Sequence, residues 1–214
     1  YERIKKANED LRFWLSNRIA FWREQGKVVG LLGGDHSIPL GYHLYLSDKE
    51  KYGILQIDAH LDLRNAYEGF QYSDASIFHN ALKFAAVEKL VQVGIRDYCE
   101  EEVERTKAEP ERIKVFYDRD LRKDLFEGQS WKEICDRIIS HLPQKVYISV
   151  DIDGLDPTLC PNTGTPVPGG LQFEELIYLM NRLAVSGRQI VGFDLCEVAP
   201  GDDEWDGNVG ARVL

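Results

Sequence analysis

The run from Ile54 to Ile57 is short, apolar and compatible with a β-strand, and it leads directly into Asp58-Ala59-His60-Leu61-Asp62. Side chains alternate between the two faces of a strand, so continued strand geometry would place the two aspartates and the histidine on one side, about 6.6 Å apart per step. Carboxylates and imidazoles that converge at the end of a buried strand are costly unless a positive charge neutralises them. The run therefore predicts a buried strand that ends at a divalent-metal site.

Apolar runs of this kind alternate with amphipathic segments along the whole chain. Strands are expected at 28–32, 53–58, 91–95, 113–117, 145–150 and 189–195, and helices at 2–25, 38–46, 76–90, 99–108, 131–141 and 173–186. This alternation is typical of a parallel sheet covered by helices on both faces. No repeat or linker-like change in composition divides the chain, so we expect residues 1–214 to form a single α/β domain.

Composition narrows the class of partner. The formal net charge of −10 argues against a nucleic acid or an anionic membrane as partner. No run approaches the roughly 18 consecutive apolar residues of a membrane span. Four widely spaced cysteines without a C-x-x-C pair predict reduced thiols in a cytoplasmic protein. In the first helix, Phe13, Trp14 and Trp22 are expected in the core or at an oligomer seam.

Side chains that can bind a metal follow four of the predicted strands. They are His36, Asp58, His60, Asp62, Asp151, Asp153 and Glu197. Ligand crevices of open α/β sheets form at the carboxyl ends of the strands, so we expect these residues at one rim. Without Glu197, the set has two imidazoles and four carboxylates; one cation cannot use all six and still admit a substrate, whereas two cations that share bridging carboxylates can. Such ligands favour Mn²⁺ or Mg²⁺, with Fe, Co, Ni and Zn left open, and a cation pair can activate water for attack on an electrophilic carbon.

Three motifs resemble the signatures of the ureohydrolase family, which comprises arginase, agmatinase, formimidoylglutamase and guanidino-acid hydrolases. They are Gly33-Gly34-Asp35-His36-Ser37, Asp58-Ala59-His60-Leu61-Asp62 and Ser149-Val150-Asp151-Ile152-Asp153-Gly154-Leu155-Asp156-Pro157. Segments 164–170 and 194–198 also match. The resemblance implies an arginase-like three-layer α/β/α sandwich with a mainly parallel sheet, and an assembly into homo-oligomers, either trimers or hexamers.

The resemblance also implies a role for each residue of the site. One Mn²⁺ would be held by His36, Asp58, Asp62 and Asp151. The second Mn²⁺ would be held by His60, Asp58, Asp151 and Asp153, so that Asp58 and Asp151 bridge. Glu197 would hold the guanidinium or amidinium of a small substrate, because a carboxylate can accept two N–H bonds from a planar cation. Hydroxide held between the cations would attack the amidine carbon, and the amine would leave. The complete second ligand set disfavours a deacetylase that uses one Zn²⁺.

Arg64 bears on the choice of substrate. A cation at this position suits an anionic substrate tail, and Asp-Ala-His-x-Asp-Leu-Arg resembles formimidoylglutamases. Formimidoyl-glutamate, hydrolysed to glutamate plus formamide, is therefore the first choice. The loop 164–170 is closer to arginases and agmatinases, so a urea-releasing arginase, agmatinase or guanidino-acid hydrolase is the alternative. Arg64 could equally be a surface ion-pair partner, with the substrate role slightly ahead. If Arg64 points into the cleft, agmatine is the least attractive substrate, because it lacks a carboxylate.

Two departures from the family pattern predict impaired activity. Asp74 stands where family members usually carry a histidine that relays protons to the leaving amine, and a carboxylate beside two cations is a poor proton donor. His79 would lie about 140° away around a helix, so it does not replace that histidine. The chain also resembles a fragment that lacks the N-terminal portion and the end of the last helix of the family. A catalytically silent, metal-binding relative is the alternative from another class.

Overall fold

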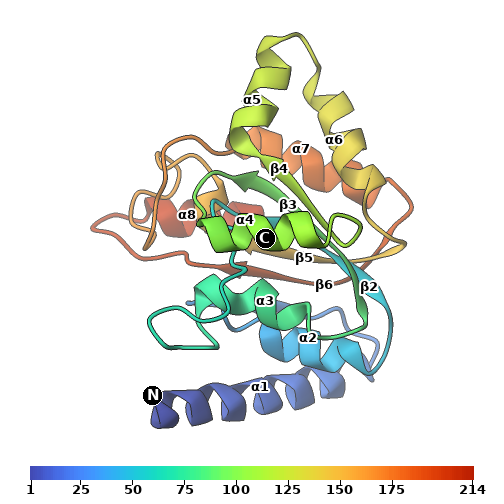
Figure 1. The fold of residues 1–214 in the computed structure, drawn as a ribbon, viewed down its shortest axis with the longest axis vertical. Coiled ribbons are helices and arrows are strands. Elements are labelled where there is room, and N and C mark those ends of the chain that lie inside the picture. The colour runs from blue at the N-terminus through green and yellow to red at the C-terminus, as the bar shows by residue number, and fades with distance from the viewer.

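Six parallel strands form the sheet at the centre of the computed structural model, which describes residues 1–214 (Figure 1). The strands are β1 (Gly30–Leu32), β2 (Tyr52–Ile57), β3 (Val87–Ile95), β4 (Ile113–Tyr117), β5 (Lys145–Asp151) and β6 (Gln189–Cys196). Their order across the sheet is β1-β6-β5-β2-β3-β4, and every neighbouring pair is parallel. The predicted strand count and the parallel sheet are confirmed.

Helices cover both faces of this sheet. They are α1 (Glu2–Arg23), α2 (Leu40–Ser47), α3 (Ile77–Ala81), α4 (Glu100–Ala108), α5 (Asp118–Phe126), α6 (Trp131–Ser140), α7 (Phe173–Ala184) and α8 (Trp205–Val213). Helices α1, α2 and α3 lie on one side of the sheet, and α5, α6 and α7 lie on the other (Figure 1). None of the helices is both long and apolar enough to cross a membrane. The three-layer α/β/α arrangement is thus the predicted one.

Strand β2 explains why the sheet has a core on each face. All six of its residues are buried, as expected for a central parallel strand. Leu55 and Ile57 pack in one apolar cluster with α6 and α7, and Ile54 packs in the other with α2 and α3. Full burial of each such side chain stabilises the fold by about 1.5–3 kcal/mol. The strand that leads into the predicted metal motif is therefore held rigidly from both sides.

The segment 76–90 is not the helix predicted from sequence. A short 3₁₀ turn (Asp74–Ser76) and the five-residue α3 occupy its first part, and β3 begins at Val87. Pairing with β2 on one side and β4 on the other draws this segment into the sheet, which outweighs its helical periodicity. Helix α5 was not predicted, because only Leu121 and Leu125 give it an apolar stripe.

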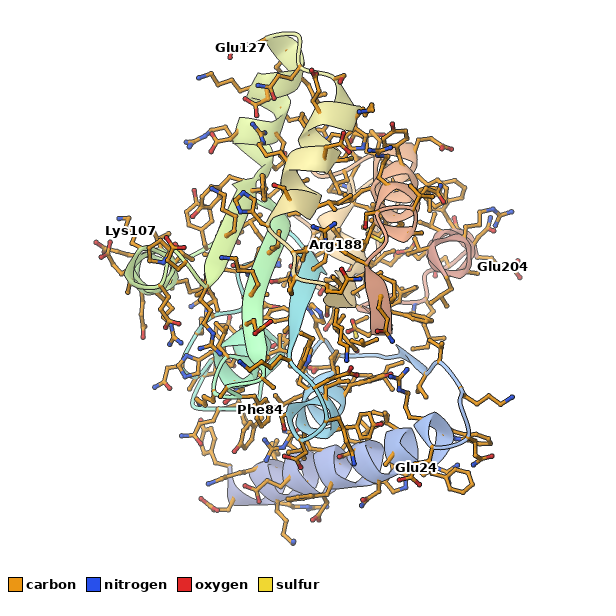
Figure 2. All side chains as sticks on the ribbon, turned by 90° about the vertical axis from the view of Figure 1, so that its right-hand side faces the viewer. Glu24, Phe84, Lys107, Glu127, Arg188 and Glu204 are labelled. Atoms are coloured by element: carbon orange, nitrogen blue, oxygen red, sulfur yellow. The ribbon has the colours of Figure 1, made fainter.

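The aromatic residues of α1 are not core residues. Phe13, Trp14 and Trp22 are 60%, 58% and 40% exposed, whereas Ile19 is buried in the apolar cluster that it shares with α2 and α3. Figure 2 shows α1, which ends close to the labelled Glu24, beneath the rest of the molecule with many side chains directed outwards. Of the two positions expected for these aromatics, the core is therefore excluded, and the oligomer seam stays a prediction.

Candidate metal centre

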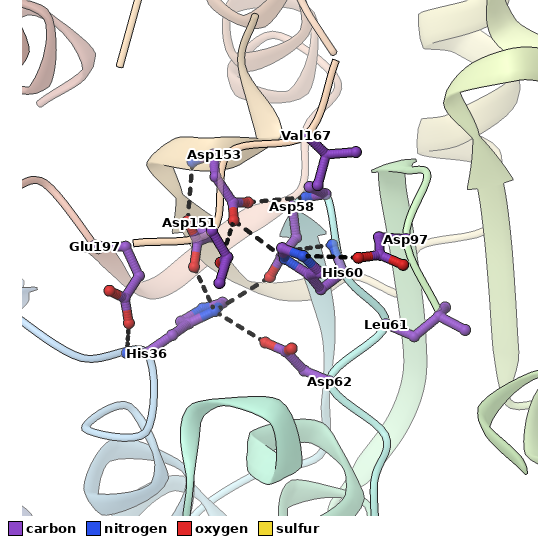
Figure 3. A network of polar contacts seen from close by, with 12 residues as sticks. His36, Asp58, His60, Leu61, Asp62, Asp97, Asp151, Asp153, Val167 and Glu197 are labelled. Atoms are coloured by element: carbon purple, nitrogen blue, oxygen red, sulfur yellow. Dashed lines mark hydrogen bonds and ion pairs between the residues drawn. The ribbon is translucent and has the colours of Figure 1, made fainter. Parts of the chain in front are cut away.

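The loops that follow β1, β2, β5 and β6 bring the predicted ligands together at one rim of the sheet (Figure 3). His36 comes from the loop after β1, and Asp58 directly follows β2. Asp151 is the last residue of β5, and Asp153 lies in the 3₁₀ turn Ile152–Gly154 behind it. Glu197 follows β6. Four neighbouring parallel strands thus deliver imidazoles and carboxylates to one place, as expected at the carboxyl edge of such a sheet.

His36 faces three carboxylates. Its Nδ1 atom lies 3.2 Å from Asp58 Oδ2, 3.2 Å from Asp62 Oδ2 and 3.4 Å from Asp151 Oδ2. The ring is buried, yet Nδ1 makes no hydrogen bond. A buried nitrogen without a hydrogen bond, aimed between carboxylate oxygens, fits a cation between them.

His60 faces a second set of carboxylates. Its Nδ1 atom lies 3.1 Å from Asp153 Oδ2 and 3.6 Å from Asp58 Oδ1. Two groups of potential ligands therefore form, one from His36, Asp58 and Asp151 and the other from Asp58, His60 and Asp153, each with its ligand atoms within 4.8 Å of one another. Asp58 belongs to both groups, as a bridging ligand would. The donor set fits two adjacent divalent cations.

The electrostatics of this cluster call for positive charge. Burial raises the pKa of Asp62 and of Asp151 well above the usual range, and the negative charge of Asp58 raises both further. Burial would lower the pKa of His60, but the nearby carboxylates of Asp153 and Asp58 raise it to about 11. Without cations, the buried carboxylates therefore depend on protons for compensation. Divalent cations would supply the same compensation through direct bonds.

The aspartates of the central motif do not converge by strand alternation. Strand β2 ends at Ile57, and Asp62 has φ of 52°, a left-handed conformation that bends the chain. The turn closes when His60 N–H donates to Asp58 Oδ1 at 2.6 Å. From the sheet, Gln56 Nε2 donates to Asp58 Oδ2 at 2.8 Å. The prediction of proximity was right, but the geometric reason given from the sequence was wrong.

Beyond the histidines, a cleft opens that contains Glu197 and Asp74. Glu197 Oε1 accepts a hydrogen bond of 2.8 Å from the backbone N–H of His36. Burial raises the pKa of the Glu197 carboxyl. Asp35, Asp74 and Glu197 have carboxylate oxygens within 4.8 Å of one another. Asp74 therefore lies beside the residue predicted to hold the substrate.

Arg64 lines the same cleft, but its charge is already partnered. Its Nε atom lies 3.8 Å from Glu102 Oε2, and its guanidinium lies 5.2 Å from the centre of the Tyr67 ring. Six carboxylates line this cleft together with Arg64: Asp62, Asp74, Asp97, Glu102, Asp151 and Glu197. The ion-pair alternative for Arg64 thus has an identified partner, and the wall of the cleft is acidic.

Polar residues inside the buried strands support the rim and were not predicted as part of the site. Gln92 of β3 donates to Gln56 Oε1 at 2.6 Å, and Gln56 in turn holds Asp58. Ser149 of β5 and Asp194 of β6 lie behind His36. Each interrupts an otherwise apolar strand, and that interruption is the signal in the sequence that could have identified them.

Comparison with known proteins agrees with this geometry. The sequence pattern of the arginase family matches residues 7–213. This chain belongs to the arginase family. It is 34% identical to the N(1)-aminopropylagmatine ureohydrolase of Synechocystis sp. over 184 residues, which are 85% of this chain and 56% of that protein. It is 35% identical to the mitochondrial arginase 1 of Arabidopsis thaliana over 185 residues, which are 83% of this chain and 49% of that protein.

A solved structure supports the fold independently. The agmatine ureohydrolase of Thermoplasma volcanium superposes with a TM-score of 0.81 at 28% identity, covering 97% of this chain and 67% of that one. The chain spans about half the length of the curated relatives named above. These relatives are ureohydrolases and an arginase, so they give no support to formimidoylglutamase as the first choice.

Proposed function

We propose that this chain carries the active site of a binuclear, manganese-dependent ureohydrolase, which hydrolyses a C–N bond of a linear guanidine and releases urea. The observation that supports this proposal most is that the Nδ1 atoms of His36 and His60 each face a separate cluster of carboxylates, and that Asp58 belongs to both clusters. One cation would be held by His36, Asp58, Asp62 and Asp151. The other would be held by His60, Asp58, Asp151 and Asp153. When bound, the cations supply Lewis acidity and make hydroxide available at neutral pH.

Glu197 binds and orients the substrate in this proposal. Its carboxylate is fixed by the His36 N–H and faces the cleft, where it can accept N–H bonds from a guanidinium. The planar cation is then held with its central carbon towards the metal-binding residues. Positioning of this kind lowers the barrier because the reacting groups lose no further freedom in the transition state.

The tail of the substrate is cationic rather than anionic in this proposal. Arg64 is paired with Glu102. Once Asp62 and Asp151 bind cations and Glu197 binds the guanidinium, the carboxylates left on the cleft wall are Asp74 and Asp97. A carboxylate tail would meet like charges, whereas an ammonium tail would be attracted. The relatives named as N(1)-aminopropylagmatine ureohydrolase and agmatine ureohydrolase also support a cationic substrate tail. An agmatine-type guanidine therefore replaces formimidoyl-glutamate as the proposed substrate.

Asp74 favours a second candidate, a metal-binding relative with little or no turnover. Asp74 stands where family members usually carry a histidine that relays a proton to the leaving amine, so without that imidazole this step would depend on water. Assembly as a trimer or hexamer and a cytoplasmic location remain predictions from the sequence.

The test is a parallel assay of the Mn²⁺-loaded protein against agmatine, N(1)-aminopropylagmatine, arginine, guanidinobutyrate and formimidoyl-glutamate. We expect urea from the first two substrates at the highest kcat/KM. Formamide from formimidoyl-glutamate at a higher kcat/KM would overturn the substrate proposal. Two bound Mn²⁺ ions with no urea and no formamide from any substrate would identify the silent relative instead.

A further inference from the structure

His36 has a second polar contact on the side of its ring that faces away from the carboxylates. Its Nε2 atom lies 2.9 Å from Ser149 Oγ. Ser149 Oγ in turn donates to the two carboxylate oxygens of Asp194, at 3.0 and 2.8 Å. All three side chains are buried, with exposed fractions of 0%, 0% and 1%. A closed chain of polar groups therefore runs from the rim into the interior of the sheet.

The sheet itself fixes the spacing of this chain. Ser149 of β5 and Asp194 of β6 are direct partners in the parallel register, so their side chains are neighbours. Ser149 and Asp151 are two residues apart on β5 and share one face of the strand. The strand that provides the predicted ligand Asp151 thus also provides the group behind His36.

The direction of the proton donors follows from their chemistry. A carboxylate only accepts, so the hydroxyl proton of Ser149 points to Asp194, and Ser149 Oγ is left to accept from His36. The acceptor oxygen requires a proton on His36 Nε2. In the neutral imidazole, Nδ1 is then bare and presents its lone pair to the carboxylates of Asp58, Asp62 and Asp151, where a cation would bind.

We infer that Ser149 and Asp194 are positioning residues that hold His36 in the Nε2–H tautomer and aim Nδ1 at one of the two cation positions. This inference rests on the proposed function, because it requires a cation between His36 and the carboxylates. Neither residue reaches the cleft, so both act through the imidazole.

His60 lacks an equivalent chain. Its Nε2 atom lies 3.8 Å from Asp97 Oδ2, beyond hydrogen-bond distance, and the Asp97 side chain is 65% exposed. The two histidines are therefore held in different ways: His36 by the buried hydrogen bonds of Ser149 and Asp194, and His60 at the edge of the cleft. Loss of these hydrogen bonds should weaken cation binding only at the position next to His36.

Calorimetric titration with Mn²⁺ tests this selectivity in the wild type, Ser149→Ala, Asp194→Asn and the double variant. We expect each single change to weaken one of two Mn²⁺ sites by about 10- to 100-fold, the usual effect of removing a partner of a metal-binding histidine, and to leave the other site unchanged. The double variant should be little weaker than Ser149→Ala, because both changes break the same chain. Ser140→Ala removes an exposed hydroxyl that bonds only to the Arg137 carbonyl, and it should change neither site.

A spectroscopic readout separates positioning from a general structural role. In protein loaded with Zn²⁺ and labelled with ¹⁵N-histidine, the wild type should show a slowly exchanging proton on His36 Nε2, and Ser149→Ala should make its exchange faster. Ser149→Thr keeps the hydroxyl and should keep the slow exchange. If Ser149→Ala does not fold, Asp194→Asn and Ser149→Thr give the same comparison.

The inference is overturned if His36 carries its proton on Nδ1, or if the Ser149 and Asp194 variants bind both Mn²⁺ ions as the wild type does. It is also overturned if both sites weaken equally. These results leave the proposed function intact as long as the wild type binds two Mn²⁺ ions and releases urea. A wild type that binds no Mn²⁺ overturns both.

Discussion

The backbone N–H of His36 donates a hydrogen bond of 2.8 Å to the carboxylate of Glu197, so a predicted metal ligand and the predicted substrate-binding residue are linked directly. A second bond runs the other way, from Glu197 N–H to the carbonyl of Gly34 at 2.7 Å. Glu197 has φ of 63°, a left-handed conformation that non-glycine residues rarely adopt. The two bonds hold this strained backbone in place, and the loops after β1 and β6 form one wall of the cleft.

Glu197→Gln tests the role of this carboxylate in substrate binding. The amide keeps the shape and can still accept the His36 N–H, but it removes the charge that attracts a guanidinium. We expect kcat/KM to fall about 10- to 100-fold, because a hydrogen bond to a charged group contributes roughly 1.5–3 kcal/mol. Mn²⁺ affinity should stay unchanged. Steady-state kinetics and calorimetry measure the two effects, and Glu104→Gln, at an exposed ion pair with Lys107, is the control. An unchanged kcat/KM would refute the role.

Asp74→His restores the residue that family members usually carry. An imidazole at this position can deliver a proton to the leaving amine, so we expect kcat to rise by about 10²-fold, the lower end of general-acid catalysis. The Mn²⁺ content, measured by elemental analysis, should not change. Kinetics identical to those of the wild type would show that proton delivery by this residue does not limit turnover.

Arg64→Gln distinguishes an ion-pair role from recognition of an anionic tail. Loss of the cation leaves Glu102 unpaired and makes the cleft more negative, so KM for agmatine should fall by up to about fivefold, within the range of exposed charge interactions. Arg119→Gln removes an exposed arginine that pairs with Asp120, and it should not change KM. A large rise in KM for arginine or formimidoyl-glutamate, with agmatine unaffected, would instead assign Arg64 to an anionic tail.

Gly154→Ala probes the close approach between the 3₁₀ turn and the end of β2. A Cβ atom at Gly154 would lie 2.6 Å from Asp58 N and 2.9 Å from Ile57 C, and backbone atoms cannot move aside easily. We expect the free energy of unfolding to fall by about 1–3 kcal/mol, as for other overpacked sites. Gly207→Ala, in α8 with no atom within 4 Å of the new Cβ, should raise it by about 0.5–1 kcal/mol. Denaturant unfolding measures both, and equal effects would contradict the packing argument.

Removal of divalent cations should destabilise the protein, because Asp58, Asp62, Asp151 and Asp153 are all buried. A ligand at about 100 times its Kd stabilises the folded state by about 2.7 kcal/mol, which corresponds to a Tm shift of roughly 5–10 °C in a chain of this size. Thermal unfolding in EDTA and after dialysis into Mn²⁺ tests this, with Mg²⁺ as the comparison. A Tm that is the same in EDTA and in Mn²⁺ would be the contrary result.

The position of a site residue could be predicted where its chemical type and its place at the end of a strand are both visible in the sequence. His36, Asp58 and Asp151 follow apolar runs, and a parallel sheet brings the ends of such runs to one edge. Nothing in a linear pattern shows that Asp62 arrives through a left-handed turn, because that bend depends on contacts with the segment around Phe78.

Features that depend on contacts between distant segments could not be predicted. Helix propensity within 76–90 was overruled by pairing of Val87–Ile95 with two neighbouring strands. Arg64 finds Glu102 only because α4 packs near the loop after β2, so the sequence alone placed its substrate role slightly ahead of its ion-pair role. The Ser149–Asp194 pair likewise exists only through the register of β5 and β6.

Anomalous diffraction at the manganese edge, from crystals equilibrated with Mn²⁺, tests the proposed centre most directly. Two peaks are expected, which mark one Mn²⁺ ion bonded to His36 and a second bonded to His60, with Asp58 in contact with both ions. A single peak, or peaks that lie away from these two histidines, would contradict a binuclear site.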